Sequence, residues 1–159
     1  MKTTILAVGT LSDAFYRDAV DEYKKRLSKS WPLTVVEIAE ARLPSEPSKA
    51  QIDAALLDEA KRMTQKIPAR AYKIAMCVEG KTIPSDALSQ RMEEAATRGA
   101  SEIVFLIGSS FGLHESIKRD ADFCLSLSPM TFPHALARVM LAEQIYRAAE
   151  IARGSRYHK

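Results

Sequence analysis

The chain has few of the residues that form disulfides and metal sites. It contains two cysteines, Cys77 and Cys124, and three histidines that lie far apart in its 159 residues. The cysteines form no C-x-x-C pair and no histidine pair flanks them. We therefore interpret both as small buried hydrophobic residues, and we expect neither a disulfide nor a bound metal ion.

Long hydrophobic runs are also absent. The first apolar run, residues 5–8, is too short for the core of a signal peptide or for a membrane span. Low-complexity tracts and internal repeats are missing, and 47% of the residues are hydrophobic. We therefore expect one compact domain over residues 1–159, located in the cytoplasm and not in contact with a membrane.

Nucleotide-binding signatures are missing as well. Gly9 stands alone where a dinucleotide-binding chain would have G-x-G-x-x-G, and no G-x-x-x-x-G-K-[ST] pattern occurs. These absences argue against nucleoside triphosphate hydrolysis.

Five short apolar runs alternate with helical patterns. Strands are predicted over residues 3–8, 33–38, 72–78, 103–107 and 123–127. Ser12 and Ser85 are expected to cap helices, and Ser48 with Gln51 has the spacing of a capping box. The last helix is predicted from Pro133 to about Arg153. This alternation predicts an α/β fold whose parallel sheet is covered by helices on both faces.

The fourth and fifth predicted strands both end in loops of small residues. Gly108-Ser-Ser-Phe-Gly112 follows the fourth strand, and Ser128-Pro-Met-Thr-Phe-Pro-His134 follows the fifth. In open α/β sheets, ligands bind in the crevice beyond the carboxyl ends of the strands. We therefore expect a ligand site between these two loops.

The first loop also matches the G-x-S-x-G nucleophile elbow of serine hydrolases. Ser110 would be the nucleophile, Asp120 or Asp122 the acid, and His134 or His158 the base. Against this reading, the chain is short for that fold and no glycine cluster for an oxyanion hole follows the third strand. A small serine hydrolase is therefore the alternative interpretation of this loop.

The modest net charge of +3 is concentrated at the C-terminal end. From residue 138 onward, five arginine and lysine residues accompany two glutamates, so the rest of the chain is neutral. A basic end on a neutral body suggests a polyanionic partner, although such residues also complement a helix dipole. Arg138 falls on the apolar face of the last helix, where its guanidinium needs water at the edge, a carboxylate or a phosphate.

Several stretches together resemble one family. They are Met1-Lys-Thr-Thr-Ile-Leu-Ala-Val-Gly9, Gly112-Leu-His114, Leu125-Ser-Leu-Ser-Pro-Met-Thr-Phe-Pro-His134, Glu143-Gln-Ile-Tyr-Arg-Ala148 and Tyr157-His-Lys159. In this order, over the whole chain, they are similar to the bacterial methyltransferases that modify N3 of a pseudouridine in 23S ribosomal RNA. These are small members of the SPOUT class. The resemblance implies an α/β fold with a C-terminal trefoil knot, and a homodimer.

The resemblance also implies S-adenosylmethionine as cofactor, bound in the knot. The matching positions are Met76, Gly108, Leu127, Ser128, Pro129, Met130, Thr131 and Phe132. Glycine permits close backbone approach at position 108, and three of the side chains offer apolar walls. The family usually has a second glycine where this chain has Ser109, so this hydroxyl is expected to narrow the pocket or to contact the methionine part of the cofactor.

We hypothesise that the catalytic residues lie in the basic C-terminal tail. Arg153, Tyr157 and His158 would stabilise the anion at N3 or accept its proton, and His158 has an ordinary pKa near neutrality. The alternative is that the tail only binds RNA phosphate. The weak charge favours an assembled ribosome or large subunit as the partner. A ribosome-binding protein without catalysis is the third reading of the sequence.

Overall fold

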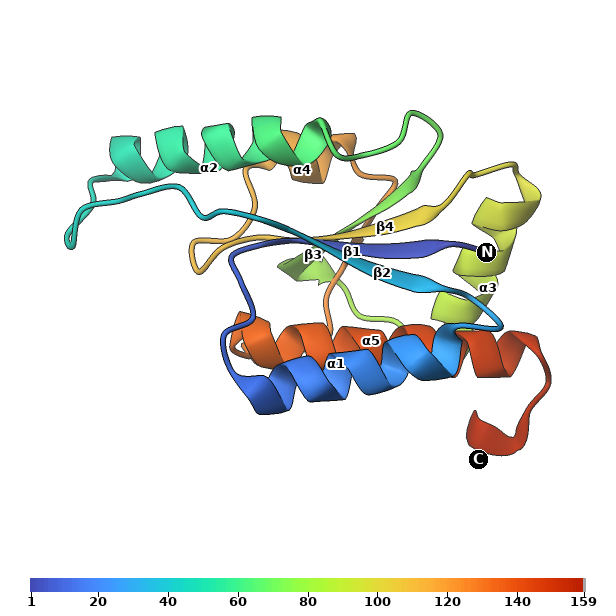
Figure 1. The fold of residues 1–159 in the computed structure, drawn as a ribbon. Coiled ribbons are helices and arrows are strands. Elements are labelled where there is room, and N and C mark those ends of the chain that lie inside the picture. The colour runs from blue at the N-terminus through green and yellow to red at the C-terminus, as the bar shows by residue number, and fades with distance from the viewer. Residues whose placement is uncertain (159) are drawn as a thin grey trace.

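Five parallel strands form one sheet in the order β2-β1-β4-β3-β5 in the computed structural model, which describes residues 1–158 (Figure 1). The strands are β1 (Thr3–Val8), β2 (Leu33–Ile38), β3 (Tyr72–Lys81), β4 (Ile103–Ile107) and β5 (Phe123–Leu125). All four neighbouring pairs are parallel. The predicted parallel α/β sheet is therefore confirmed.

Helices cover both faces of this sheet (Figure 1). One face carries α1 (Ala14–Leu27), α3 (Ser85–Thr97) and α5 (His134–Ala152), and the other carries α2 (Lys49–Thr64) and α4 (Glu115–Asp120). A short helix, η1 (Arg156–His158), follows α5. No helix in the described part of the chain is both long enough and apolar enough to cross a membrane.

The two hydrophobic cores explain why the central strands do not alternate in polarity. Every residue of β1 and β4 is buried. On one face they pack against Met92 and Leu141, and on the other against Met63 and Ile117. Strands that are buried on both faces are continuously apolar, as the sequence of β4 is.

The edge strand β5 is shorter than predicted, and its neighbour β3 is longer. We predicted strands over 72–78 and 123–127, whereas β3 ends at Lys81 and β5 ends at Leu125. The reason is a long-range contact: Leu125 pairs with both Met76 and Lys81, because β3 has an irregularity between those two residues. The Ser126 N–H then donates to the Lys81 carbonyl, 3.0 Å away, and the chain leaves the sheet.

Two of the three predicted serine caps are wrong. Ser48 does form the capping box, since its hydroxyl accepts from the Gln51 N–H at 3.2 Å. The N-cap of α1 is Asp13 rather than Ser12. Ser85 is the first residue of α3, and its hydroxyl donates instead to Gln144 on α5 at 2.6 Å. The last helix begins at His134, one residue after the predicted Pro133, which is its N-cap.

The parallel arrangement places the two ends of α5 at opposite edges of the sheet (Figure 1). Its first turn lies beside the carboxyl ends of the strands. Its last turn and η1 lie at the edge where the strands begin. A helix of 19 residues spans about 28 Å, so the tail and the carboxyl-end loops are far apart within one chain.

Candidate functional site

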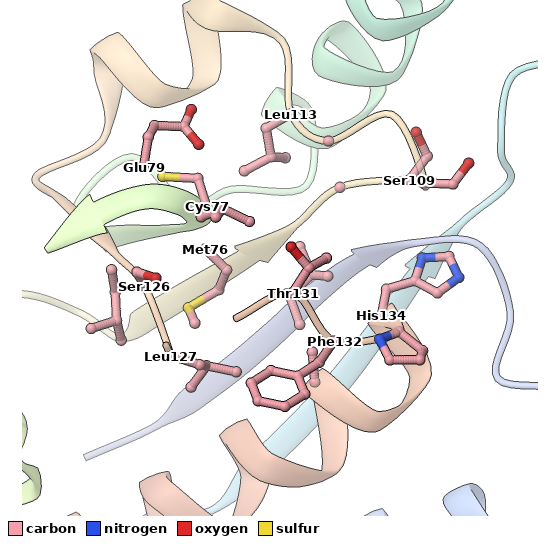
Figure 2. Close-up of a pocket in the computed structure, with 18 of the residues that line it drawn as sticks. Met76, Cys77, Glu79, Ser109, Leu113, Ser126, Leu127, Thr131, Phe132 and His134 are labelled. Carbon is pink, nitrogen blue, oxygen red and sulfur yellow. The ribbon is translucent and has the colours of Figure 1, made fainter. Parts of the chain in front are cut away.

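A cavity of about 780 Å³ opens at the carboxyl ends of β3, β4 and β5. Its walls come from the end of β3, the loop after β4, the loop after β5 and the first turn of α5. Figure 2 shows Ser109 and Leu113 on one side, Leu127 and Phe132 on the other, and Met76 between them. The volume and the mostly apolar lining are typical of a small-molecule site.

The loop after β4 is a tight turn that requires glycine at its base. The Gly112 N–H donates to the Ser109 carbonyl at 2.9 Å, and the two residues form an isolated antiparallel bridge. A Cβ atom on Gly108 would lie 2.1 Å from the Gly112 carbonyl oxygen. Only glycine allows the turn to close back on the strand in this way.

Ser109, where the family usually has glycine, is buried at the edge of the cavity. Its side chain lies close to the carboxyl of Glu59 on α2, which is 3% exposed and whose Oε2 has no hydrogen-bond partner among the described residues. Burial raises the pKa of Glu59, and a hydrogen bond from the Ala41 N–H, 2.9 Å long, opposes that effect. A buried carboxyl group with a raised pKa therefore lies directly behind the turn.

The loop after β5 supplies the opposite wall and is held by its own serines. The Ser126 hydroxyl donates to the Ser128 carbonyl at 2.9 Å, and the Ser128 hydroxyl accepts from the Met130 N–H at 3.0 Å. Such serine turns replace backbone pairing where a strand has ended. They hold the 126–133 segment across the mouth of the cavity.

Seven of the eight residues predicted to bind the cofactor line this one cavity. They are Met76, Gly108, Leu127, Ser128, Met130, Thr131 and Phe132. Pro129 is exposed and is not part of the lining. The structure thus brings together segments that are up to 56 positions apart in the sequence.

Lys118 of the cavity lining is paired with two carboxylates. The ammonium of Lys118 contacts the carboxylates of Glu79 and Glu115. Burial alone would lower the pKa of Lys118, but these two carboxylates raise it above its ordinary value. Burial also raises the pKa of the Cys77 thiol to about 12, so the thiol stays neutral in the cavity wall.

His134 is a candidate hydrolase base in the sequence and otherwise a local hydrogen-bonding residue, and the structure shows that it lines the cavity from the first turn of α5. Its Nδ1 atom is buried and has no hydrogen-bond partner within the described chain. A buried polar atom without a partner is costly unless a ligand supplies one. The Pro-His pair at a predicted helix start was the available signal, because helix starts at this edge of a parallel sheet face the ligand crevice.

Arg138, one turn further along α5, has a carboxylate partner inside the protein. Its Nη1 atom lies 2.7 Å from Glu37 Oε1, and its Nη2 donates to the Val8 and Gly9 carbonyls at 2.9 and 2.8 Å. The side chain is 3% exposed. Burial lowers the pKa of Arg138, and Glu37 opposes that shift. Arg138 therefore joins α5 to the ends of β1 and β2 behind the cavity.

The predicted catalytic residues lie at the far end of α5. The Tyr157 hydroxyl donates to Glu143 at 3.3 Å, and its ring lies 4.8 Å from the Arg147 guanidinium. Burial, together with the Glu143 charge, raises the pKa of Tyr157, so its hydroxyl is a hydrogen-bond donor at neutral pH. Arg153 pairs with Glu150 at 2.9 Å.

Within one chain, the structure does not bring this tail to the cavity (Figure 1). Arg153 and Tyr157 are absent from the cavity lining. The side chain of His158 lies outside the described part of the structure, so its predicted role has no geometry here.

A serine hydrolase triad with His134 as its base is not assembled. Ser110 is exposed at the tip of the turn, and neither His114 nor His134 forms a hydrogen bond with it. Asp122 accepts a hydrogen bond from the Lys73 N–H at 2.7 Å, where β5 begins, at the opposite edge of the sheet from the cavity. The described residues also hold no group of three His, Cys, Asp or Glu side chains placed to bind a metal ion.

Comparison with known proteins identifies the class of chain to which these features belong. A family model described as "Predicted SPOUT methyltransferase" matches residues 1–158. One similar solved structure is described as that of a probable methylase family protein from Haemophilus influenzae Rd KW20. It is 12% identical, with 99% of this chain and 70% of that chain covered and a TM-score of 0.53. At that identity the likeness concerns the fold.

Proposed function

The chain belongs to the SPOUT methyltransferase family, which uses S-adenosylmethionine, and from this premise we propose that it methylates N3 of a pseudouridine in large-subunit ribosomal RNA. The observation that carries the proposal is the cavity between the Gly108 turn and the 126–133 loop. The residues that match the RNA-modifying family converge there.

The cavity suits the cofactor by shape and by chemistry. Gly108 lets the turn close against the end of β4 beside the cavity, and Leu127, Met130 and Phe132 provide apolar walls. The unpartnered Nδ1 of His134 offers a polar contact. When bound, S-adenosylmethionine supplies a methyl group already activated by its sulfonium. The chain has to bind it, exclude water and align the methyl with the nucleophile.

The uracil-like N3–H is a weakly acidic imide, so the reaction also needs a group to receive its proton or stabilise the anion. We assign this to Arg153, Tyr157 and His158. Arg153 brings a positive charge, and Tyr157, whose pKa is raised, brings a hydrogen-bond donor. That leaves His158 as the proton acceptor, since an ordinary histidine titrates near neutral pH.

The distance between tail and cavity makes a homodimer part of the proposal. Within one chain, about 28 Å of α5 separates His134 from Arg153. In an isologous dimer each tail can meet the partner's cavity, and both sites form together. Each active site would then combine the cofactor cavity of one subunit with the tail of the other.

The proposal includes the trefoil knot of the class. Its support is the crowding around β5, where β3 pairs with Leu125 on both sides of its irregularity. A Cβ on Gly80 would lie 2.7 Å from the Leu125 carbonyl carbon, so the backbones pass in direct contact.

The proposed substrate is the assembled ribosome or large subunit rather than free RNA. A net charge of +3 per chain is too small to bind naked RNA firmly at physiological salt. Recognition of an assembled particle adds shape complementarity to this weak attraction.

The test is transfer of labelled methyl from S-adenosylmethionine to ribosomes from cells that lack the activity. Ribosomes with and without the target pseudouridine are compared. Label in large-subunit RNA only where pseudouridine is present is the expected result. Cofactor binding without label in either preparation would contradict the substrate, and absence of both would contradict the methyltransferase assignment for this cavity. Binding to ribosomes without turnover would favour the non-catalytic reading.

A further inference from the structure

At the mouth of the cofactor cavity, large apolar side chains are exposed to solvent instead of packing in the hydrophobic core. Val78, Phe111 and Met130 are 55%, 46% and 71% exposed, and all three line the cavity. Large hydrophobic side chains that gather at one opening usually mark a binding surface. We call these three residues the apolar lip.

Phe111 is the aromatic member of the lip and is held by a rigid turn. It is the third residue of the Ser109–Gly112 turn, which the 2.9 Å hydrogen bond between Gly112 and Ser109 closes. Gly112 lies against Gly108 where a Cβ atom would otherwise stand, so the turn packs closely on the end of β4. The backbone therefore presents the ring at the opening, and little conformational entropy is lost when a ligand binds it.

The electrostatics of the lining exclude a phosphate as the group recognised here. Lys118 is the only lysine or arginine among the lining residues, and it is paired with Glu79 and Glu115. No free cation of the described chain therefore faces the cavity. A flat, neutral aromatic ring is matched instead by the face of a nucleobase, which stacks without a charged partner.

We propose that Phe111 is a stacking platform that holds the target nucleobase over the cofactor cavity, with Met130 closing on it from the opposite loop. The inference rests on the proposed function, because the occupant is the base that receives the methyl group. Figure 2 shows the two loops facing each other across the cavity, with Ser109 on one side and Thr131 on the other. A base inside structured RNA has to leave its stack to reach this depth, and Phe111 replaces the lost stacking partner.

Kinetics of methyl transfer to ribosomes test the platform. Phe111→Ala is expected to raise KM for ribosomes by roughly 5- to 150-fold, the loss that follows from one stacked base, while the Kd for S-adenosylmethionine stays unchanged. Phe111→Tyr should keep wild-type kinetics, whereas Phe111→Leu, which is apolar but not aromatic, should resemble Phe111→Ala. Phe15→Ala is the matched control, because Phe15 is 65% exposed and is not part of the cavity lining.

Photo-crosslinking separates this inference from the proposed reaction. With p-benzoylphenylalanine at position 111, we expect one crosslink to large-subunit RNA, and none to that nucleotide from position 15. The crosslink without methyl transfer by the wild-type protein would retain the platform and overturn the proposed reaction. Transfer with normal KM in Phe111→Ala would overturn the platform alone. A crosslink only to a second copy of the chain, or weakened cofactor binding in Phe111→Ala, would also overturn it.

Discussion

At the scale of single residues, the shape of the cavity depends most on Gly108. A methyl group at this position would lie 2.1 Å from the Gly112 carbonyl oxygen and 2.3 Å from its carbon. Both atoms are backbone, so no side chain can move aside to relieve the clash.

Gly108→Ala should therefore open the turn and weaken S-adenosylmethionine binding at least about tenfold, a change of about 1.4 kcal/mol. Isothermal titration calorimetry measures it. The matched control is Ser110→Ala, two positions along the same turn, whose side chain is exposed and should be dispensable for binding. Full affinity in Gly108→Ala would mean that the turn takes no part in holding the cofactor.

A second residue-scale prediction concerns Glu59, the buried carboxyl behind the turn. Burial raises its pKa, so the folded protein holds this proton more tightly than the unfolded chain does. The resulting stability is fully present below the unfolded pKa and is lost as pH rises through the raised folded value. Ionised Glu59 is a cost to stability at neutral pH.

Glu59→Gln keeps an oxygen acceptor for the Ala41 N–H but cannot ionise. We expect the variant to be more stable than the wild type at pH 8, with the difference shrinking toward pH 5. Urea unfolding at several pH values measures this. An exposed control, Glu46→Gln, should show no such trend. Equal pH dependence in both variants would show that Glu59 ionises in the fold as it does in water.

At the scale of elements, α5 is fixed to the sheet by one buried ion pair. Arg138 reaches three acceptors on two strands and the loop after β1: Glu37, the Val8 carbonyl and the Gly9 carbonyl. Glu37 in turn accepts from the Leu11 N–H at 3.0 Å, which holds the same loop. The start of α5, and with it His134, takes its place in the cavity wall from this contact.

Arg138→Met should lower the free energy of unfolding by about 3–5 kcal/mol, because removal of one partner leaves the others buried and unpaired. Glu37→Gln should cost less, since an amide oxygen still accepts from Arg138 and Glu37 is itself partly exposed. Urea unfolding measures both. The opposite order, with Glu37→Gln the more damaging, would show that the carboxylate charge matters more than the arginine's hydrogen bonds.

Features that depend on neighbouring residues could be predicted from the sequence, whereas features that depend on contacts between distant residues could not. The capping box of α2 could be predicted, because Ser48 and Gln51 are three positions apart. The hydroxyl of Ser85 bonds Gln144, 59 positions away, and no local pattern indicates that choice. Arg138 was predicted to need a partner, but Glu37 lies 101 positions earlier in the chain.

The same limit applies to the candidate site. The resemblance to a known family indicated seven residues that line the cavity, because the family's motifs fall on the two loops. Phe111, Lys118 and the cavity-facing position of His134 were not predicted, since each depends on how those loops meet in space. Pro129 was carried over with its neighbours, yet the turn made by Ser126 and Ser128 leaves it outside the lining.

At the scale of the whole molecule, the decisive fact is that α5 has the cavity at one end and the tail at the other (Figure 1). Tyr157 is held there by Glu143, Arg147 and a ring contact with Tyr146 at 4.8 Å, so the chain cannot simply fold its tail back. If both ends act in one reaction, they act in different subunits.

Two inactive variants with different defects should therefore regain methyl transfer when they form a mixed dimer. One carries Gly108→Ala and an intact tail, and the other has an intact cavity but ends at residue 152. Purified through two different tags, their mixed dimer has one complete site, so we expect about half of the wild-type transfer to ribosomes. At S-adenosylmethionine concentrations well below the Kd of Gly108→Ala, that parent dimer should transfer little methyl and the truncated parent none. The truncated chain alone should still bind S-adenosylmethionine, which shows that it is folded. A mixed dimer as inactive as its parents would mean that cavity and tail have to belong to the same chain, and would contradict the shared active site.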